Sequence, residues 1–101
     1  MVLTLAGLLL VRSPALRAES DGEDLFEMMR SDAGRSVAQI FIDDVWKKWN
    51  ERLFCLPPGD PQQLSFDAVM IHLETHPEQL HRPRRYLIVQ GLRAAYPCST
   101  E

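Results

Sequence analysis

The sequence predicts an all-α fold, a small bundle of four to five helices held by one disulfide bond. Apolar residues recur at three- and four-residue spacing along most of the chain, and residues typical of helix starts and stops separate these segments. No stretch sustains the alternation of apolar and polar residues that indicates a strand. We expect one small domain over residues 19–101, because no internal linker or repeat divides that part of the chain.

The first eighteen residues resemble an export signal. Val2–Val11 is an apolar run of ten residues, whereas a helix that spans a bilayer needs roughly 20. A polar break with a proline follows, and Ala18 precedes the acidic Glu19. We expect a signal peptide over residues 1–18, cut after Ala18, and a periplasmic protein with no membrane insertion after cleavage. The alternative is a disordered tail on a cytoplasmic protein.

Capping residues predict two helices in the N-terminal half of the domain. Ser20 lies three residues before Glu23 and begins a short helix over about residues 23–29. Ser31 or Asp32 caps a longer helix that runs to about residue 53. Apolar residues recur every four positions along it and predict its buried stripe, which Ile40, Ile42 and Trp46 flank: Val37, Phe41, Val45, Trp49 and Leu53.

Two further helices follow Pro57-Pro58-Gly59. Asp60 as cap, Pro61 at the first helical position and Gln63 at the third begin a helix that ends near His76. Pro83 is expected in the first turn of the last helix. The predicted apolar faces of these two helices are Leu64, Ala68, Val69, Ile71 and Leu73, then Tyr86, Leu87, Val89, Leu92 and Ala95.

The two cysteines follow the second and the last predicted helix. An even cysteine count in a small exported domain is typical of a disulfide, so we expect a Cys55–Cys98 bond. The alternative is two buried thiols in a reducing compartment. A catalytic dithiol usually has its cysteines close in sequence, so the predicted bond is structural rather than redox-active.

Charge and motifs exclude several function classes. Without Arg12 and Arg17, the chain carries nine basic and fourteen acidic residues, a net charge of −5. Six of the acids lie in residues 19–32, and such a domain lacks the basic surface that nucleic acid requires. His72 and His76 are four residues apart, with His81 nearby, but no His-Glu-X-X-His motif accompanies them. Glycine-rich phosphate loops and nucleophile elbows are also missing, so we expect no enzyme, no catalytic residue, no metal and no cofactor.

Three segments carry a family resemblance. Phe54-Cys55-Leu56-Pro57-Pro58-Gly59, Leu73-Glu74-Thr75-His76-Pro77-Glu78 and Gly91-Leu92-Arg93-Ala94-Ala95-Tyr96-Pro97-Cys98 resemble the Rap/Tai-type immunity proteins of bacterial type VI secretion. The resemblance covers roughly Leu25 to Cys98. It implies an exported helical domain that binds and blocks a peptidoglycan-cleaving amidase effector in the periplasm. Its partner would be that cognate amidase effector protein.

Departures from the family pattern are also visible. The family often has a second cysteine pair, and this chain has Met28 or Met29 and Ala38 at the corresponding places. The alternative function is a periplasmic helical protein with a structural or stress-related role and no toxin partner.

Loops between helices carry binding residues more often than buried faces do. Of the two candidate segments, Pro57–Gln63 and His76–Arg85, we favour the second because it places charged side chains at a turn bounded by prolines. Its candidate partner-binding residues are His76, His81, Arg82, Arg84 and Arg85. The alternative is a solvated helix start whose arginines pair with the acids of the domain.

Trp46 and Trp49 are predicted to border one apolar surface, because they lie close to one helical turn apart. That surface is either core or a dimer interface, which leaves a homodimer open.

Overall fold

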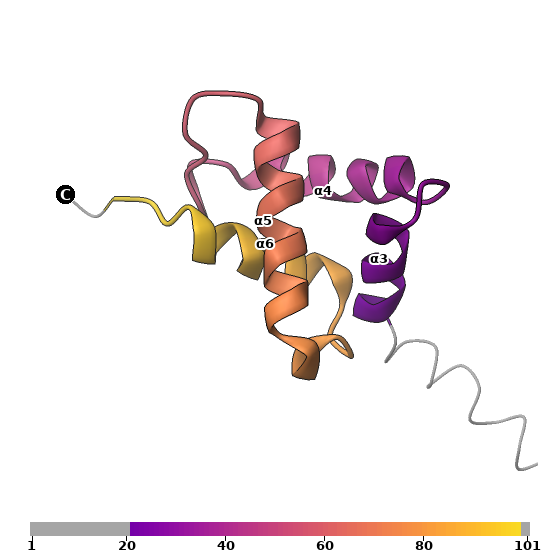
Figure 1. Ribbon diagram of the computed structural model, residues 1–101. Helices are drawn as coiled ribbons and strands as arrows, with labels where there is room; N and C mark the ends of the chain where they lie inside the picture. The colour runs from indigo at the N-terminus through magenta and orange to yellow at the C-terminus, as the bar shows by residue number, and fades with distance from the viewer. Residues whose placement is uncertain (1–20, 100–101) are drawn as a thin grey trace, which may run out of the picture.

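Four α-helices and one 3-10 turn make up the domain in a computed structural model that describes residues 21–99 (Figure 1). The predicted all-α class is confirmed, and the predicted signal peptide lies outside the described residues. No described helix is both long enough and apolar enough to cross a membrane. The elements are α3 (Asp21–Arg30), α4 (Arg35–Trp49), α5 (Pro61–Thr75), η1 (Pro77–Gln79) and α6 (Arg84–Ala95).

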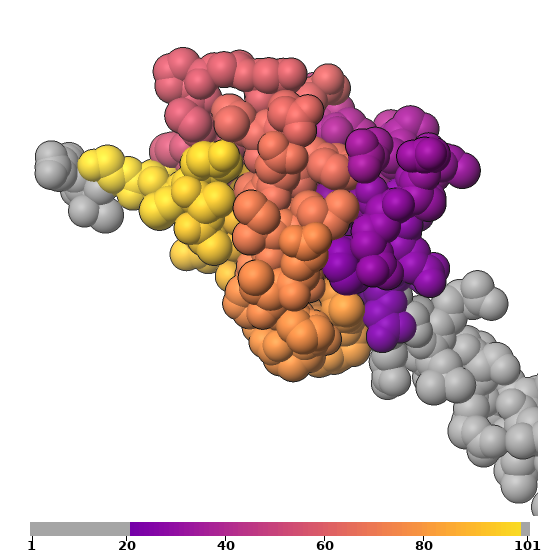
Figure 2. Space-filling view, viewed as in Figure 1, coloured from indigo at the N-terminus to yellow at the C-terminus, as the bar shows by residue number. Residues whose placement is uncertain are grey.

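The helices surround a single core. Each of the four contacts the other three, and α5 crosses in front of α6 in the view of Figure 1. Figure 2 shows α5 at the centre of one face of the molecule and α3 along its side. The fully buried large apolar side chains are drawn from all four helices and from the segment after α4, and they are Leu25, Met29, Ile42, Phe54, Val69, Leu73, Leu87, Ile88 and Leu92.

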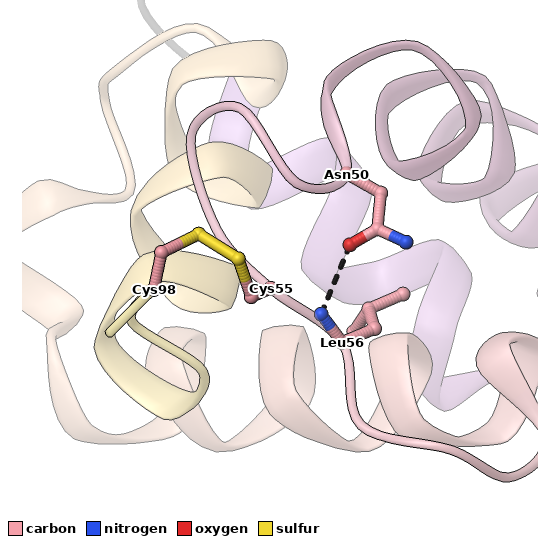
Figure 3. The surroundings of a disulfide bond; sticks show 4 residues. All are labelled: Asn50, Cys55, Leu56 and Cys98. Carbon is pink, nitrogen blue, oxygen red and sulfur yellow. Dashed lines mark hydrogen bonds between the residues drawn. A yellow bond between two sulfur atoms is a disulfide. The ribbon is translucent and has the colours of Figure 1, made fainter. Parts of the chain in front are cut away.

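Helix α4 is shorter than predicted at both ends. Ser31 does not cap it; instead the Ser31 Oγ accepts a hydrogen bond from the Gly34 N–H at 2.9 Å, within a turn that delays the helix to Arg35. At the other end Asn50 leaves helical geometry, with ψ at 138°, and Glu51 has a φ of 72°. The Asn50 side chain accepts a hydrogen bond from the Leu56 N–H at 2.9 Å, which stabilises the turn (Figure 3).

The buried face of α4 also differs from the predicted stripe. Val37 is 43% exposed and Leu53, beyond the end of the helix, is 39% exposed, so the prediction is wrong at both. The side chains that α4 buries are Ala38, Ile42 and Val45, so the buried face keeps Val45 of the predicted stripe and is rotated toward the flanking Ile42. The rotation arises because α4 packs against three helices at once, and the side chain of Ala38 is small enough to be fully enclosed.

Helix α5 begins as predicted. The Asp60 carboxylate accepts hydrogen bonds from the N–H groups of Gln62 (3.1 Å) and Gln63 (3.4 Å), and Pro61 is the first helical residue. Its predicted face is wrong at Ile71, which is 60% exposed, whereas the next residue, His72, is buried.

Helix α6 begins at Arg84, so Pro83 takes the capping position rather than the first turn. Its predicted face is wrong at Tyr86 and Ala95, which are exposed, while Ile88 is buried instead.

The predicted disulfide is confirmed. Cys55 and Cys98 are bonded, with a Cα–Cα distance of 4.8 Å, and the bond joins the segment after α4 to the segment after α6 (Figure 3). The backbone N–H of Cys55 also donates to the Tyr96 carbonyl at 2.8 Å. Met29 and Ala38, two of the positions where the family resemblance places a second cysteine pair, are both fully buried apolar side chains.

Candidate partner-binding surface

The predicted binding loop connects α5 to α6 through η1. Backbone hydrogen bonds from Gln79 to His76 (3.0 Å) and from Arg82 to Gln79 (2.9 Å) close two successive turns. His81, Arg82 and Arg85 are exposed, and the Arg82 guanidinium lies 5.0 Å from the centre of the Tyr86 ring. The loop therefore presents cations to solvent on a backbone held by local hydrogen bonds and by Pro77 and Pro83.

Arg84 differs from the other loop cations because its side chain is held by an ion pair and a ring contact with other helices. Its Nη1 lies 2.8 Å from Asp21 Oδ1, and its backbone N–H donates to Asp21 Oδ2 at 2.8 Å. The guanidinium lies 4.1 Å from the centre of the Phe41 ring. Arg84 thus connects α6 to the first residue of α3 and to α4. The alternative interpretation, arginines paired with acids of the same domain, applies to Arg84.

His76 lies at the start of the loop and packs on a second histidine. The rings of His72 and His76 are stacked with their centres 4.2 Å apart. Nδ1 of His76 lies 3.0 Å from the His72 carbonyl oxygen, and the tautomer with a proton on Nδ1 donates a hydrogen bond to that carbonyl. His76 therefore stabilises the end of α5, at the base of the loop.

His72 is buried, and its Nε2 has no hydrogen-bond partner among residues 21–99. Burial lowers the pKa of His72 below its ordinary value of 6.5, and the neighbouring His76 lowers it further. The side chains of Gln79 and Glu78 oppose this shift of the pKa. Within the described part of the chain, no group of three or more histidine, cysteine, aspartate or glutamate side chains is placed to hold a metal ion.

Two open hollows lie on either side of Phe41 and Arg84. The first is about 670 Å³, lies between α3 and α4, and is lined by Asp24, Glu27, Met28, Ser31, Val37, Phe41 and Arg84. The second is about 420 Å³, shares Phe41 and Arg84 with the first, and is also lined by Asp21, Asp44, Val45, Pro83, Arg85 and Ile88. Sequence reasoning missed both hollows. The four-residue spacing of Val37 and Phe41 predicts a place for both side chains in the core instead.

Trp46 and Trp49 are half-buried and pack against the core. The Trp46 indole N–H donates to Asp43 Oδ1 at 2.8 Å, and Lys47 and Lys48 lie over the two indole rings at 5.8 and 5.9 Å. The two tryptophans therefore belong to the edge of the core, which is one of the two predicted roles.

A disulfide-bonded helical domain with an exposed cationic loop and open, partly apolar hollows has the features of a small protein-binding domain. The chain belongs to the Rap1a immunity proteins, because a sequence model of that family matches residues 21–98, nearly all of the described domain. The family resemblance carried by the cysteine and proline segments is thereby confirmed. Membership supports an immunity role and implies binding of a cognate effector. No curated protein and no solved structure was found to match the chain.

Proposed function

We propose that this chain is a periplasmic immunity protein that binds and sterically blocks a peptidoglycan-cleaving amidase effector of type VI secretion. The observation that carries the proposal is the match to the immunity family across residues 21–98. The Cys55–Cys98 bond supports an oxidising compartment, and the periplasm is one where disulfides persist. The apolar run at residues 2–11 is consistent with export to it.

The mechanism is occlusion, in which a surface formed before binding covers the cleft of the effector. We assign the contact to the loop between α5 and α6, with His81, Arg82 and Arg85 as exposed contacts. His76 and Arg84 act as positioning residues, because their hydrogen bonds hold the two ends of the loop. A loop restrained in this way loses little conformational entropy when it is bound, and this favours affinity.

Inhibition of an amidase tests the function itself. If a gene next to this one encodes a small secreted amidase, that enzyme is the candidate effector. Its hydrolysis of purified peptidoglycan is then measured with increasing amounts of the full chain. We expect hydrolysis to stop once the two proteins are equimolar. If hydrolysis continues at full rate and calorimetry detects no binding, the proposal is wrong, and a helical protein without a toxin partner takes its place.

Charge reversal tests the loop. Arg82→Glu with Arg85→Glu is expected to weaken amidase binding without changing helical content, because both side chains are exposed. Arg84 is left unchanged, since its reversal would break the ion pair with Asp21 and lower stability. Arg52→Glu with Arg93→Glu is the control, with the same change of charge at exposed positions outside the loop. If both double variants bind the amidase as wild type does, the loop is not the binding site.

A further inference from the structure

We infer that the hollow between α3 and α4, formed by Asp24, Glu27, Met28, Val37 and Phe41, binds a segment of the effector in which an apolar side chain is flanked by lysine or arginine. We call this site the α3–α4 hollow. The inference deepens the proposed function and rests on it for the identity of the partner. It does not rest on the loop between α5 and α6.

The apolar part of the argument begins on α4. Val37 lines the hollow and is 43% exposed, although it is a large apolar side chain in a folded domain. Phe41 and Met28 are half-buried and provide the floor of the α3–α4 hollow. Exposed apolar surface beside a polar rim is typical of a protein-binding site. The hollow, at about 670 Å³, has room for one large side chain of a partner.

Two acidic side chains line the hollow without a cationic partner in the described part of the chain. Asp24 and Glu27 are exposed, lie three residues apart on α3, and have no ion pair among residues 21–99. Arg84, the cation at the edge of the hollow, is already paired with Asp21 and lies over Phe41. The nearby cations of α3 and α4 do not line the hollow, because Arg30 lies over Phe26 at 4.2 Å and Arg35 over Phe66 at 5.2 Å.

A hollow with an apolar floor and two free carboxylates is complementary to an apolar side chain with neighbouring cations. An acidic segment would be repelled, and a neutral apolar one would leave both carboxylates without a partner. The second hollow shares Phe41 and Arg84 with the first and extends to Pro83 and Arg85 at the end of the loop. One partner can therefore contact the loop and the α3–α4 hollow together.

Peptide binding to the full chain tests this chemistry directly. The probe is the tripeptide acetyl-Lys-Phe-Lys-amide, followed by methyl NMR of the methionine and valine side chains. We expect shifts of the Met28 and Val37 methyl signals that saturate and that weaken as salt is added. The control peptides acetyl-Glu-Phe-Glu-amide and acetyl-Lys-Gly-Lys-amide should leave these signals in place. Equal shifts with the acidic peptide, or no shift with the cationic one, would overturn the inference.

Matched variants locate the interaction. Asp24→Asn with Glu27→Gln should weaken binding of the cationic peptide about fivefold or more, from the usual strength of two exposed charge pairs. Glu23→Gln with Glu74→Gln makes the same change of charge at exposed sites outside the hollow and should bind as wild type does. Val37→Ser should also weaken binding, whereas Ile71→Ser, at another exposed apolar residue, should not.

The same variants separate this inference from the proposed function. Suppose that the wild-type chain blocks the amidase and that the double variant Asp24→Asn with Glu27→Gln blocks it with the same affinity. The α3–α4 hollow is then not part of the interface, and the proposed function stands. If the wild-type chain does not bind the amidase, the proposed function fails, and the effector assignment of the hollow fails with it. The peptide titration then reports on the chemistry of the hollow alone.

Discussion

Removing the disulfide should destabilise this domain more than most single changes on its surface would. The bond links residues 43 positions apart, so it restricts a long loop of the unfolded chain. The chain-entropy relation assigns about 4 kcal/mol to a loop of that length at 25 °C. A small domain has a total free energy of unfolding of only about 5–15 kcal/mol, so the loss is a large fraction of it.

The variant is Cys55→Ser with Cys98→Ser, which leaves no free thiol. Its helical content should match that of wild type at low temperature, because the bond acts mainly on the unfolded chain. Its melting temperature should fall by about 15–30 °C, from the usual relation between stability and melting in domains of this size. The measurements are thermal and urea unfolding followed by far-UV circular dichroism. Wild-type protein treated with a reductant is the matched control and should melt as the variant does.

Two outcomes would refute this reasoning. One is a variant whose free energy of unfolding lies within about 1 kcal/mol of wild type, the size of an ordinary substitution. The other is a variant that loses its helices even without denaturant, which would show that the bond holds the native packing rather than restricting the unfolded chain. In that case the hydrogen bond from the Cys55 N–H to the Tyr96 carbonyl would also be lost with the bond.

The remaining predictions concern Arg84 and His72. Arg84→Gln and Asp21→Asn should each lower the free energy of unfolding by about 1 kcal/mol, because the ion pair is partly exposed. A double-mutant cycle by urea unfolding should show that the two losses are not additive, and additive losses would contradict the pairing. The pKa of His72 is lowered in the folded state, so protonation favours the unfolded chain. The contribution of neutral His72 to the free energy of unfolding should be complete above pH 6.5. It should be lost as the pH falls below 6.5 through the folded-state pKa. His72→Gln should reduce this pH dependence when the free energy of unfolding is measured across that range, whereas His81→Gln, at an exposed residue, should leave it unchanged; equal slopes in both variants would contradict the assignment.

Several features of the fold could be predicted because they depend on residues close together in the chain. Asp60 and Pro61 begin α5 through hydrogen bonds that reach no further than Gln63. The end of α5 before Pro77 follows from the same kind of local rule. The cysteine bond was predicted from the count of two and from the export-like start of the chain, and the family resemblance from short segments around those cysteines.

The sides of the helices that face inward could not be predicted with the same accuracy. Val37 and Ile71 fit the apolar periodicity of their helices, yet both are exposed, while His72 is buried. Periodicity defines an apolar stripe only to within one residue, which is a rotation of about 100°. Where that stripe points is set by the other helices packed against it, and α4 packs against three.

By itself, the sequence determined the helical class, the start of α5, the pairing of Cys55 with Cys98 and the family. Tertiary structure alone decided that Arg84, unlike the exposed cations of the loop, pairs with Asp21, a residue 63 positions away. It also decided that Asp24 and Glu27 border an apolar hollow rather than a plain polar face. The physical reason is the range of the interactions: caps, turns and breakers act within a few residues, whereas burial and ion pairing depend on which helices come together.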